Sequence, residues 1–286
     1  MAFRSVDSLL RASERLPLWE AVLEDDLRDR GAERASSLAR MSSLWSAMKE
    51  TVASYDPGRR SASGLSGGAG ALLDSGGEGL CGPYFRAIIA AALKTGECNA
   101  CMGRIVAAPT AGASGVLPAV LLPYQERFGT SDEQMVRALY VAAGFGQVIA
   151  ARASISGAEG GCQAEIGSAS AMAAAALAFL HGGSPGQMAD ACAMAIKNLL
   201  GLVCDPVAGL VEVPCVKRNV VGAMNAMACA EMALAGARSA IPCDEVLDAM
   251  RSVGDAMPAS LRETGQGGLA ATPTGRRIAD EMGGRD

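Results

Sequence analysis

Three cysteines stand in stretches where a thiol could reach a ligand. Cys162 lies in the segment SISGAEGGCQAEIGSAS, and Cys204 and Cys215 lie in the segment GLVCDPVAGLVEVPCVKRN. Pro206 and Pro214 separate the last two cysteines, and proline interrupts the interior of a helix. We therefore expect all three thiols at loop positions or helix ends, where a thiolate can turn towards a metal.

The number of these thiols limits the kind of metal centre. A structural zinc site needs four ligands, so three cysteines are one short. A four-iron cluster is normally held by cysteine thiolates, and three of them leave one iron open. An open iron is a Lewis acid, which can bind a substrate hydroxyl and carboxylate and make the hydroxyl a better leaving group. On spacing alone, the cluster is an indication and not an assignment.

For the remaining cysteines that the pattern places, a structural role is favoured over metal binding. The chain has nine cysteines, and an odd number argues against a disulfide framework. Cys98 and Cys101 form a CxxC pair, but no second pair follows it, so a zinc or redox role is not favoured. Cys192, Cys229 and Cys243 fall in or beside apolar helices, where a free cysteine behaves as a small buried hydrophobe.

Composition narrows the class of protein. Half of the residues are hydrophobic and only 4% are aromatic, so Ala, Leu, Val, Met and Ile must build the core. The net charge is -5 and the 25 basic residues form no dense run, which argues against nucleic acid as a partner. The N-terminus lacks the apolar region of a signal peptide. The uncharged run Ile166 to Leu180 is too short to span a bilayer. We expect a cytoplasmic chain without a membrane partner.

Hydrophobic spacing predicts an all-α fold. Residues 5–55 place apolar residues at helical spacing with charges between them, which predicts two or three amphipathic helices. No run alternates at period two, and no βαβ pattern or repeat is present. We expect these N-terminal helices (1–57) to pack on a catalytic domain (58–286), the two forming one continuous domain. Further helices are predicted at about 83–95, 99–107, 115–128, 132–153, 167–181, 185–200, 218–237 and 243–255.

Glycine-rich loops interrupt these helices. Irregular segments lie at 107–118, 154–170 and 204–215, and loops in an apolar setting usually line a site because their backbone groups need partners. The stretch 58–82 holds nine glycines. That density is typical of a flexible linker or of a loop that lays backbone N–H groups against an anion, and we favour the loop.

Several long motifs resemble one enzyme family. The segments RASISGAEGGCQAEIGSASAMAAAALA and NLLGLVCDPVAGLVEVPCVKRN closely resemble the α subunit of the two-chain, iron–sulfur-dependent bacterial L-serine dehydratases. So do MGRIVAAPTAGASGVLPAVL, SGLSGGAG and LRETGQGGLAATPTG. The resemblance covers nearly the whole chain. It implies an all-helical catalytic domain that deaminates L-serine to pyruvate and ammonia.

The resemblance also implies a [4Fe–4S] cluster on three cysteines. By position these are Cys162, Cys204 and Cys215, in the family's spacing C-x41-C-x10-C. Glu212 would then shape the loop between the last two, with an outer-shell role left open. Some single-chain relatives end in a cysteine that caps the open iron, whereas this chain ends in GGRD, so we expect no such cap.

The motif loops supply candidates for substrate binding. Elimination from serine removes the α-proton and expels the β-hydroxyl, and the ammonium group needs a polar pocket. Arg218 could pair with the substrate carboxylate bidentately, although a surface arginine at a helix start is an equally good interpretation. The candidates are Ser66, Gly67, Gly68, Thr110, Ser114, Arg218 and Asn219.

The general base is not visible in the sequence. The family's Ser-Ser-x-x-His-Thr motif belongs to its β subunit, and this chain has one histidine, His181, in an expected helix-end turn. We expect a β subunit that could supply the base. We also expect self-association, because the mean hydropathy of +0.22 indicates buried association surface. Segment 58–82 is the expected lid facing the partner.

Three other functions remain open at this stage. A pyridoxal-phosphate dehydratase would need a Schiff-base lysine, for which Lys197 in AIKNLLG is the best of four lysines, but no βαβ cofactor domain surrounds it. A cluster-binding redox sensor without turnover would not need the polar loops. Elimination of sulfide from L-cysteine would use the same iron chemistry with a softer leaving group.

Overall fold

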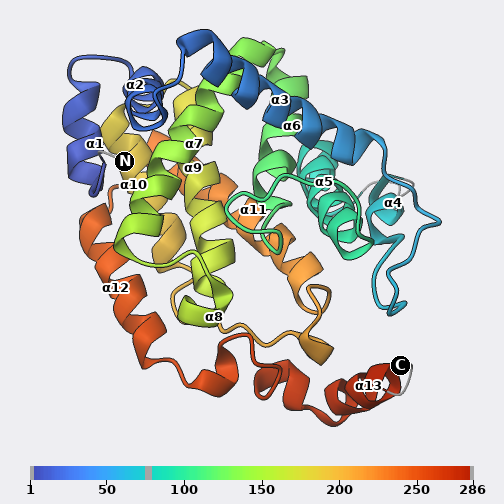
Figure 1. Cartoon of the computed structure of the whole chain (residues 1–286). Helices are drawn as coiled ribbons and strands as arrows, with labels where there is room; N and C mark the ends of the chain where they lie inside the picture. The colour runs from blue at the N-terminus through green and yellow to red at the C-terminus, as the bar shows by residue number, and fades with distance from the viewer. Residues whose placement is uncertain (1–2, 75–78, 284–286) are drawn as a thin grey trace.

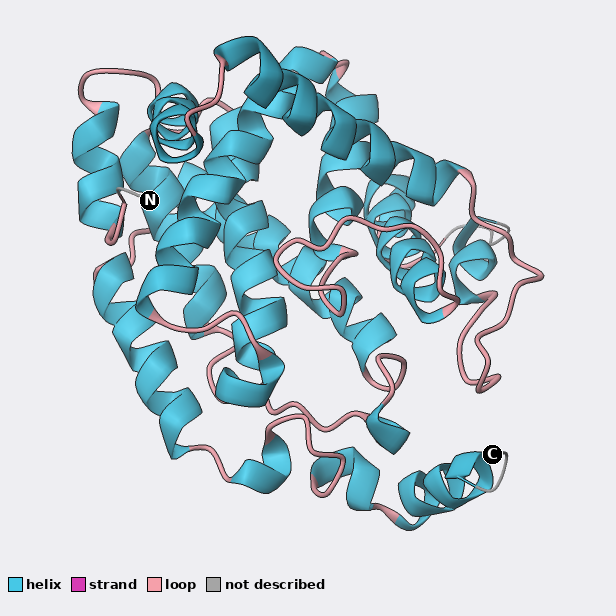
Figure 2. Cartoon of the chain, viewed as in Figure 1, coloured by secondary structure: helices cyan, strands magenta, loops and turns pink. Residues whose placement is uncertain are grey.

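The computed structural model describes residues 3–74 and 79–283, and within these ranges it contains helices and loops but no strand (Figure 2). Residues 75–78 of the glycine-rich segment and the last three residues of GGRD lie outside the described residues. The expected all-α fold is confirmed. The α-helices are α1 (Val6–Ser13), α2 (Leu18–Arg30), α3 (Arg34–Ala53), α4 (Ala69–Asp74), α5 (Gly82–Ala100), α6 (Val116–Phe128), α7 (Asp132–Arg152), α8 (Gly157–Gly160), α9 (Ser168–Leu180), α10 (Pro185–Lys197), α11 (Cys215–Leu234), α12 (Cys243–Ala256) and α13 (Pro273–Gly283). A π-helical turn (Gln163–Gly167) leads into α9, and 3₁₀ turns lie at Val207–Gly209, Ala259–Leu261 and Gly268–Ala271.

Helix α9 lies in the middle of the molecule (Figure 1) and packs against α6, α7, α10 and α11. Every residue from Ser168 to Ala178 is buried, and most are alanine, so neighbouring helices can approach closely. The contact is tight at Gly222 of α11, where a Cβ would lie 2.9 Å from Val116 and 3.0 Å from Ile166. Small residues therefore build the core, as the composition predicts.

One stretch in the described part of the chain, Gln163–Leu180, is long and apolar enough by length and composition to cross a membrane. It contains the π-helical turn and α9, and 83% of it is buried inside the fold. A central core helix has the same composition as a membrane span, because both are apolar all round. Its burial is compatible with a soluble protein.

The N-terminal helices pack on the rest of the chain through α7. Asp132, the first residue of α7, accepts hydrogen bonds from Trp45 Nε1 at 2.9 Å and from Lys49 Nζ at 2.7 Å, both on α3. The bond from Lys49 is the main cause that lowers the pKa of Asp132 to about 2. Ser37 and Tyr140 form a buried hydroxyl pair at 2.6 Å. These helices share one hydrophobic core with the later ones.

The helix expected at 99–107 does not form. Helix α5 continues beyond its expected end and stops before Met102, which has a left-handed φ of 57°. The backbone N–H groups of Met102 and Gly103 then turn back onto the carbonyls of Asn99 and Cys98. A left-handed residue commonly ends a helix, but it is usually glycine. Here it is methionine, so the sequence carries no clear stop signal.

The C-terminal segment runs along one end of the helices (Figure 1). Helix α13 packs on the short turn Val207–Gly209, between the second and third predicted cysteine ligands. Backbone hydrogen bonds join Cys204 N to Leu261 O at 2.9 Å and Glu263 N to Cys204 O at 2.8 Å. The tail therefore fixes the backbone on which the second cysteine stands.

Candidate active site

Three separate segments bring the predicted thiols together. Cys162 immediately precedes the π-helical turn. The backbone N–H of Gln163 donates to Leu202 O at 2.9 Å, which joins this turn to the segment carrying Cys204. Cys215 is the first residue of α11. Each thiol therefore lies at a loop position or helix end, as the sequence predicts.

The three thiols lie near one another; Cys162 and Cys204 are buried and Cys215 is partly buried. Cys162 and Cys204 each expose 4% of their surface. Burial raises the pKa of Cys162 to about 11 and that of Cys215 to about 12, and it also raises the pKa of Cys204. Negative charge on Cys162 raises the pKa of the other two thiols further. Holding three thiolates here at neutral pH therefore requires a compensating cation.

The thiols are not arranged around one small ion. Within the described ranges, no group of three or more His, Cys, Asp or Glu residues could hold a single metal ion. A mononuclear zinc site needs four ligands at about 2.0–2.3 Å from the metal. The three thiols in this arrangement therefore do not form a mononuclear zinc site.

A carboxylate that the sequence analysis did not select lies beside the thiols. Glu165 follows Cys162 by about one helical turn, which places both on one face. Its Oε1 accepts a hydrogen bond from Thr110 Oγ1 at 2.7 Å, and its Oε2 lies 3.9 Å from Cys204 Sγ. Burial raises the pKa of Glu165. The one-turn spacing after a ligand cysteine is the sequence signal that could have found it, and π-helical turns are frequent at functional sites.

Arg218 is bonded within the chain. Its Nη1 donates to Val203 O at 2.7 Å, and its Nη2 donates to Asp205 Oδ1 at 2.9 Å. Asp205 is itself buried and accepts from Leu269 N at 2.9 Å. Arg218 therefore links α11 to the segment around the second cysteine and, through Asp205, to the C-terminal tail. The guanidinium also faces Cys162, where its charge opposes the rise in the pKa of that thiol.

Asn219 joins two of the predicted loops. Its side chain is buried; Oδ1 accepts from Gly115 N at 2.8 Å, and Nδ2 donates to Gly112 O at 2.8 Å and to Cys215 O at 3.1 Å. These bonds fix the loop before α6 against the first turn of α11. Ser114, in the same loop, has a buried hydroxyl without a hydrogen-bond partner among the residues that the structure describes.

Glu212 connects the glycine-rich segment to the cysteine loop. Its carboxylate is buried and accepts hydrogen bonds from Ser61 Oγ at 2.6 Å and Ser63 Oγ at 2.8 Å. Ser61 Oγ in turn accepts from Ser66 N at 3.2 Å. The structure thus gives Glu212 the loop-shaping contacts expected from the sequence, and it places Ser66 beside the cysteine loop.

The backbone at Gly67 and Gly68 needs glycine. Both residues have positive φ, 129° and 86°, and a Cβ on Gly67 would lie 2.2 Å from Arg59 O. The following turn is anchored by the buried Glu97, which accepts from Ala69 N at 2.9 Å and from Gly70 N at 3.1 Å. The described part of the segment is therefore a docked loop and not a free linker.

Two other features considered for chemistry, His181 and the CxxC pair, lie away from the three thiols. His181 follows the last residue of α9, about 20 Å along that helix from its first turn at 1.5 Å per residue. Its Nδ1 lies 3.2 Å from Tyr124 Oη, in an apolar groove. Cys98 and Cys101 stand at the end of α5 beside a separate small pocket. The histidine is therefore poorly placed to act on a substrate bound at the thiols.

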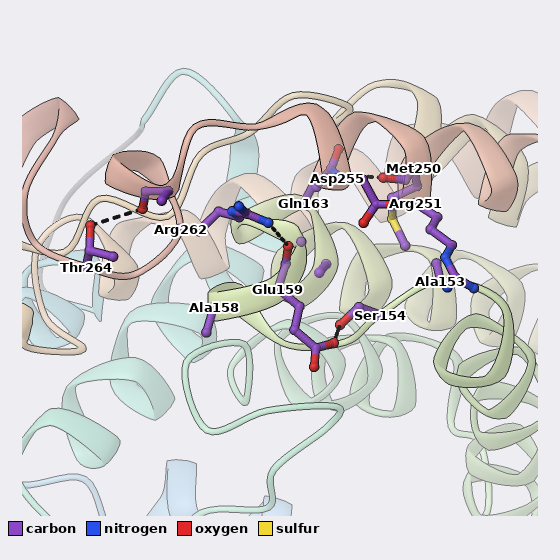
Figure 3. Close-up of a pocket in the computed structure, with 14 residues that line it drawn as sticks. Ala153, Ser154, Ala158, Glu159, Gln163, Met250, Arg251, Asp255, Arg262 and Thr264 are labelled. Atoms are coloured by element: carbon purple, nitrogen blue, oxygen red, sulfur yellow. Dashed lines mark hydrogen bonds between the residues drawn. The ribbon is translucent and has the colours of Figure 1, made fainter.

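A polar pocket of about 550 Å³ opens beside the π-helical turn, between the end of α7, α8 and α12 (Figure 3). Glu159 faces it and accepts a hydrogen bond from Ser154 Oγ at 2.7 Å. Gln163 crosses it to donate to Met250 O at 2.9 Å. None of the three thiols lines this pocket, and the sequence analysis named none of the residues that do.

Gly157 of α8 lies so close to the thiol site that a side chain at this position would disturb the site. A Cβ there would lie 2.6 Å from Glu165 Oε2 and 3.0 Å from Cys204 Sγ. We expect Gly157→Ala to displace the flexible carboxylate and lower activity, with a stability loss of about 1 kcal/mol, the lower end for an overpacked core.

Thermal unfolding and turnover measured together check this prediction. A loss of about 1 kcal/mol lowers the Tm by about 2–4 °C in domains of 150–250 residues. The matched control is Gly186→Ala, whose Cβ meets only Ser184 Oγ, at 3.9 Å. Unchanged turnover in Gly157→Ala would show that the position of this carboxylate does not matter.

Fold and site together define a class: an all-helical protein that gathers three thiols and a carboxylate where three loops meet. The chain belongs to the serine dehydratase alpha chain family, whose model matches residues 13–270. It is therefore an enzyme, and the sensor without turnover is disfavoured.

The chain is similar to curated members over most of its length. It is 48% identical over 287 residues to the probable L-serine dehydratase alpha chain of Bacillus subtilis, covering 99% of this chain and 96% of the relative. It is 56% identical over 195 residues to the corresponding chain of Latilactobacillus sakei, covering 68% and 93%. It is also 47% identical over 182 residues to L-serine dehydratase 2 of Escherichia coli, covering 63% of this chain but 40% of that protein.

Proposed function

We propose that this chain is the α subunit of an L-serine dehydratase, which deaminates L-serine to pyruvate and ammonia. The observation that carries the proposal is the convergence of Cys162, Cys204 and Cys215 from three segments, all within the part of the chain that matches the family. The names of the relatives from Bacillus subtilis and Latilactobacillus sakei support the substrate and the subunit.

We further propose that Cys162, Cys204 and Cys215 hold a [4Fe–4S] cluster. The donor set supports this: two buried thiols and one partly buried thiol interact with one another, need a cation to ionise, and do not surround a single ion. When bound, such a cluster with three protein ligands supplies an open iron, a Lewis acid that favours loss of a hydroxyl group.

The residues of the chain have separate roles in this proposal. Arg218 and Asn219 hold the loops in position through hydrogen bonds within the chain, and their role in substrate binding stays a prediction. Ser114 offers a buried hydroxyl without a partner in the described residues. Ser66, Thr110 and the backbone of Gly67 and Gly68 complete the proposed polar lining. Loss of water from serine yields an enamine, which tautomerises and hydrolyses to pyruvate and ammonia.

We propose a β subunit and a second copy of this chain as partners, in the cytoplasm. The matched part of Escherichia coli L-serine dehydratase 2 is 40% of that protein, so the remainder of a single-chain enzyme would correspond to another chain here. An apolar groove of about 560 Å³ between α5, α6, α9 and α11, which includes the exposed Phe85 and Phe128, supports an association surface.

The pyridoxal-phosphate alternative finds no support in the fold. Lys197 donates to Ser239 Oγ at 2.9 Å, and the described residues contain no sheet that could form an α/β cofactor domain. Elimination of sulfide from L-cysteine stays the second candidate, because it needs the same thiols.

The test is anaerobic reconstitution of this chain with iron, sulfide and its β subunit. Pyruvate is then assayed with L-serine, D-serine, L-threonine and L-cysteine. We expect L-serine to be the best substrate and the protein to have the brown colour of an iron–sulfur cluster. Faster turnover of L-cysteine would assign the desulfidase function instead, and a pyridoxal absorption band would overturn the cofactor.

A further inference from the structure

The carboxylate of Glu165 has acceptor capacity that this chain does not use fully. An ionised carboxylate offers about four acceptor sites. Thr110 Oγ1 occupies one at 2.7 Å, and the remaining side-chain hydrogen bond among the described residues is the long one of 3.9 Å to Cys204 Sγ. No lysine or arginine in the described ranges forms an ion pair with it. The threonine therefore orients the carboxylate and leaves the side near the thiol available.

The charges around Glu165 favour a cation. Glu263 lies near enough to disfavour negative charge on it. The nearest guanidinium, that of Arg218, is already bonded to Asp205 and to Val203 O. Glu165 is partly buried, and its unused acceptor capacity can bind a positively charged ligand group through a charge-assisted hydrogen bond.

Two glycines lie against this carboxylate. A Cβ on Gly112 would lie 3.5 Å from Glu165 Oε1, and one on Gly157 would lie 2.6 Å from Oε2. Two loops thus approach the carboxylate without side chains of their own. A small polar group, such as a primary ammonium, fits this setting better than a bulky one.

The geometry points to Glu165 as the residue that selects amino acids by binding the α-ammonium group of the substrate, with Thr110 holding the carboxylate in position. This inference rests on the proposed function. The ammonium would then lie next to Cys204, so the substrate is placed beside the thiols. A 2-hydroxy acid would lose this charged hydrogen bond and would be bound less well.

The test compares L-serine with L-glycerate, which keeps the carboxylate and 3-hydroxyl of serine but carries a hydroxyl in place of the ammonium. In the reconstituted two-chain enzyme, Glu165→Gln should raise the KM for L-serine about 10-fold or more, the effect of losing a hydrogen bond to a charged group. The inhibition constant of L-glycerate should stay unchanged. The variant should therefore lose the preference of the enzyme for L-serine over L-glycerate.

Two further variants keep the test specific. Thr110→Val removes only the orienting hydrogen bond and should raise the KM for L-serine less, in the same direction. Glu159→Gln changes an acid in the same segment that faces the polar pocket and bonds Ser154 (Figure 3), so it should leave both constants unchanged. If Glu165→Gln does not fold, the test uses the other two variants: the inference requires Thr110→Val to raise the KM for L-serine more than Glu159→Gln does.

A readout independent of turnover separates recognition from a structural role. L-Serine should raise the Tm of the iron-loaded wild-type chain, and Glu165→Gln should lose this shift while keeping its iron. Loss of iron from Glu165→Gln would assign Glu165 to the metal site, and an unchanged KM at full iron content would show that it does not bind the ammonium; either result would overturn the inference. Absence of L-serine turnover in the wild type would instead overturn the proposed function.

Discussion

Cys204→Ser should purify with little iron and with activity at least about 100-fold below the wild type, because even outer-shell partners of metal ligands change affinity or activity by about 10–100-fold. The same is expected of Cys162→Ser and Cys215→Ser. All three thiols are held by backbone that the fold fixes separately, so a neighbouring residue cannot replace a missing ligand.

Iron and sulfide content, measured with turnover after anaerobic reconstitution, checks the expected loss. Cys98→Ser is the matched control, because this thiol stands in the last turn of α5 with Arg104 O as its contact at 3.7 Å. It should keep both iron and activity. A full iron complement in Cys204→Ser would sink the ligand assignment, and a lowered Tm shared by the control would point to instability instead.

The cysteines could be placed from the sequence because their signal is local. Prolines and glycines around Cys162, Cys204 and Cys215 interrupt helices, so each cysteine is expected at a helix end or in a loop. Local signals also located most helices. They failed at 99–107, where a methionine takes the left-handed position that usually belongs to glycine.

The contacts between loops could not be predicted in the same way. Arg218 is bonded to Asp205, which is bonded to Leu269 on the tail, and no spacing rule links positions so far apart. Thr110 and Glu165 meet from different segments for the same reason. Type and spacing therefore nominate candidate ligands, while only the fold shows which polar groups are already used within the chain.

Without its β subunit, the reconstituted chain should have almost no L-serine turnover although it holds its cluster. The chain has one histidine, and that residue lies about 20 Å along α9 from the first turn of that helix, at 1.5 Å per residue. The first thiol stands before the π-helical turn that leads into α9. Its partner is Tyr124 Oη, in the apolar groove. A general base must come within hydrogen-bond reach of the proton that it removes, directly or through one water.

The measurement is pyruvate formation by this chain alone and after titration with the β subunit, with iron content followed in both. Turnover should rise from near zero and saturate at one β subunit per α subunit, while the iron per α subunit stays constant. His181→Asn should behave as the wild type once the partner is present, because the histidine lies away from the thiols. Equal turnover with and without the β subunit would place the base within this chain. Since Glu165 is the carboxylate that lies beside the thiols, it would then be the first residue to test as that base.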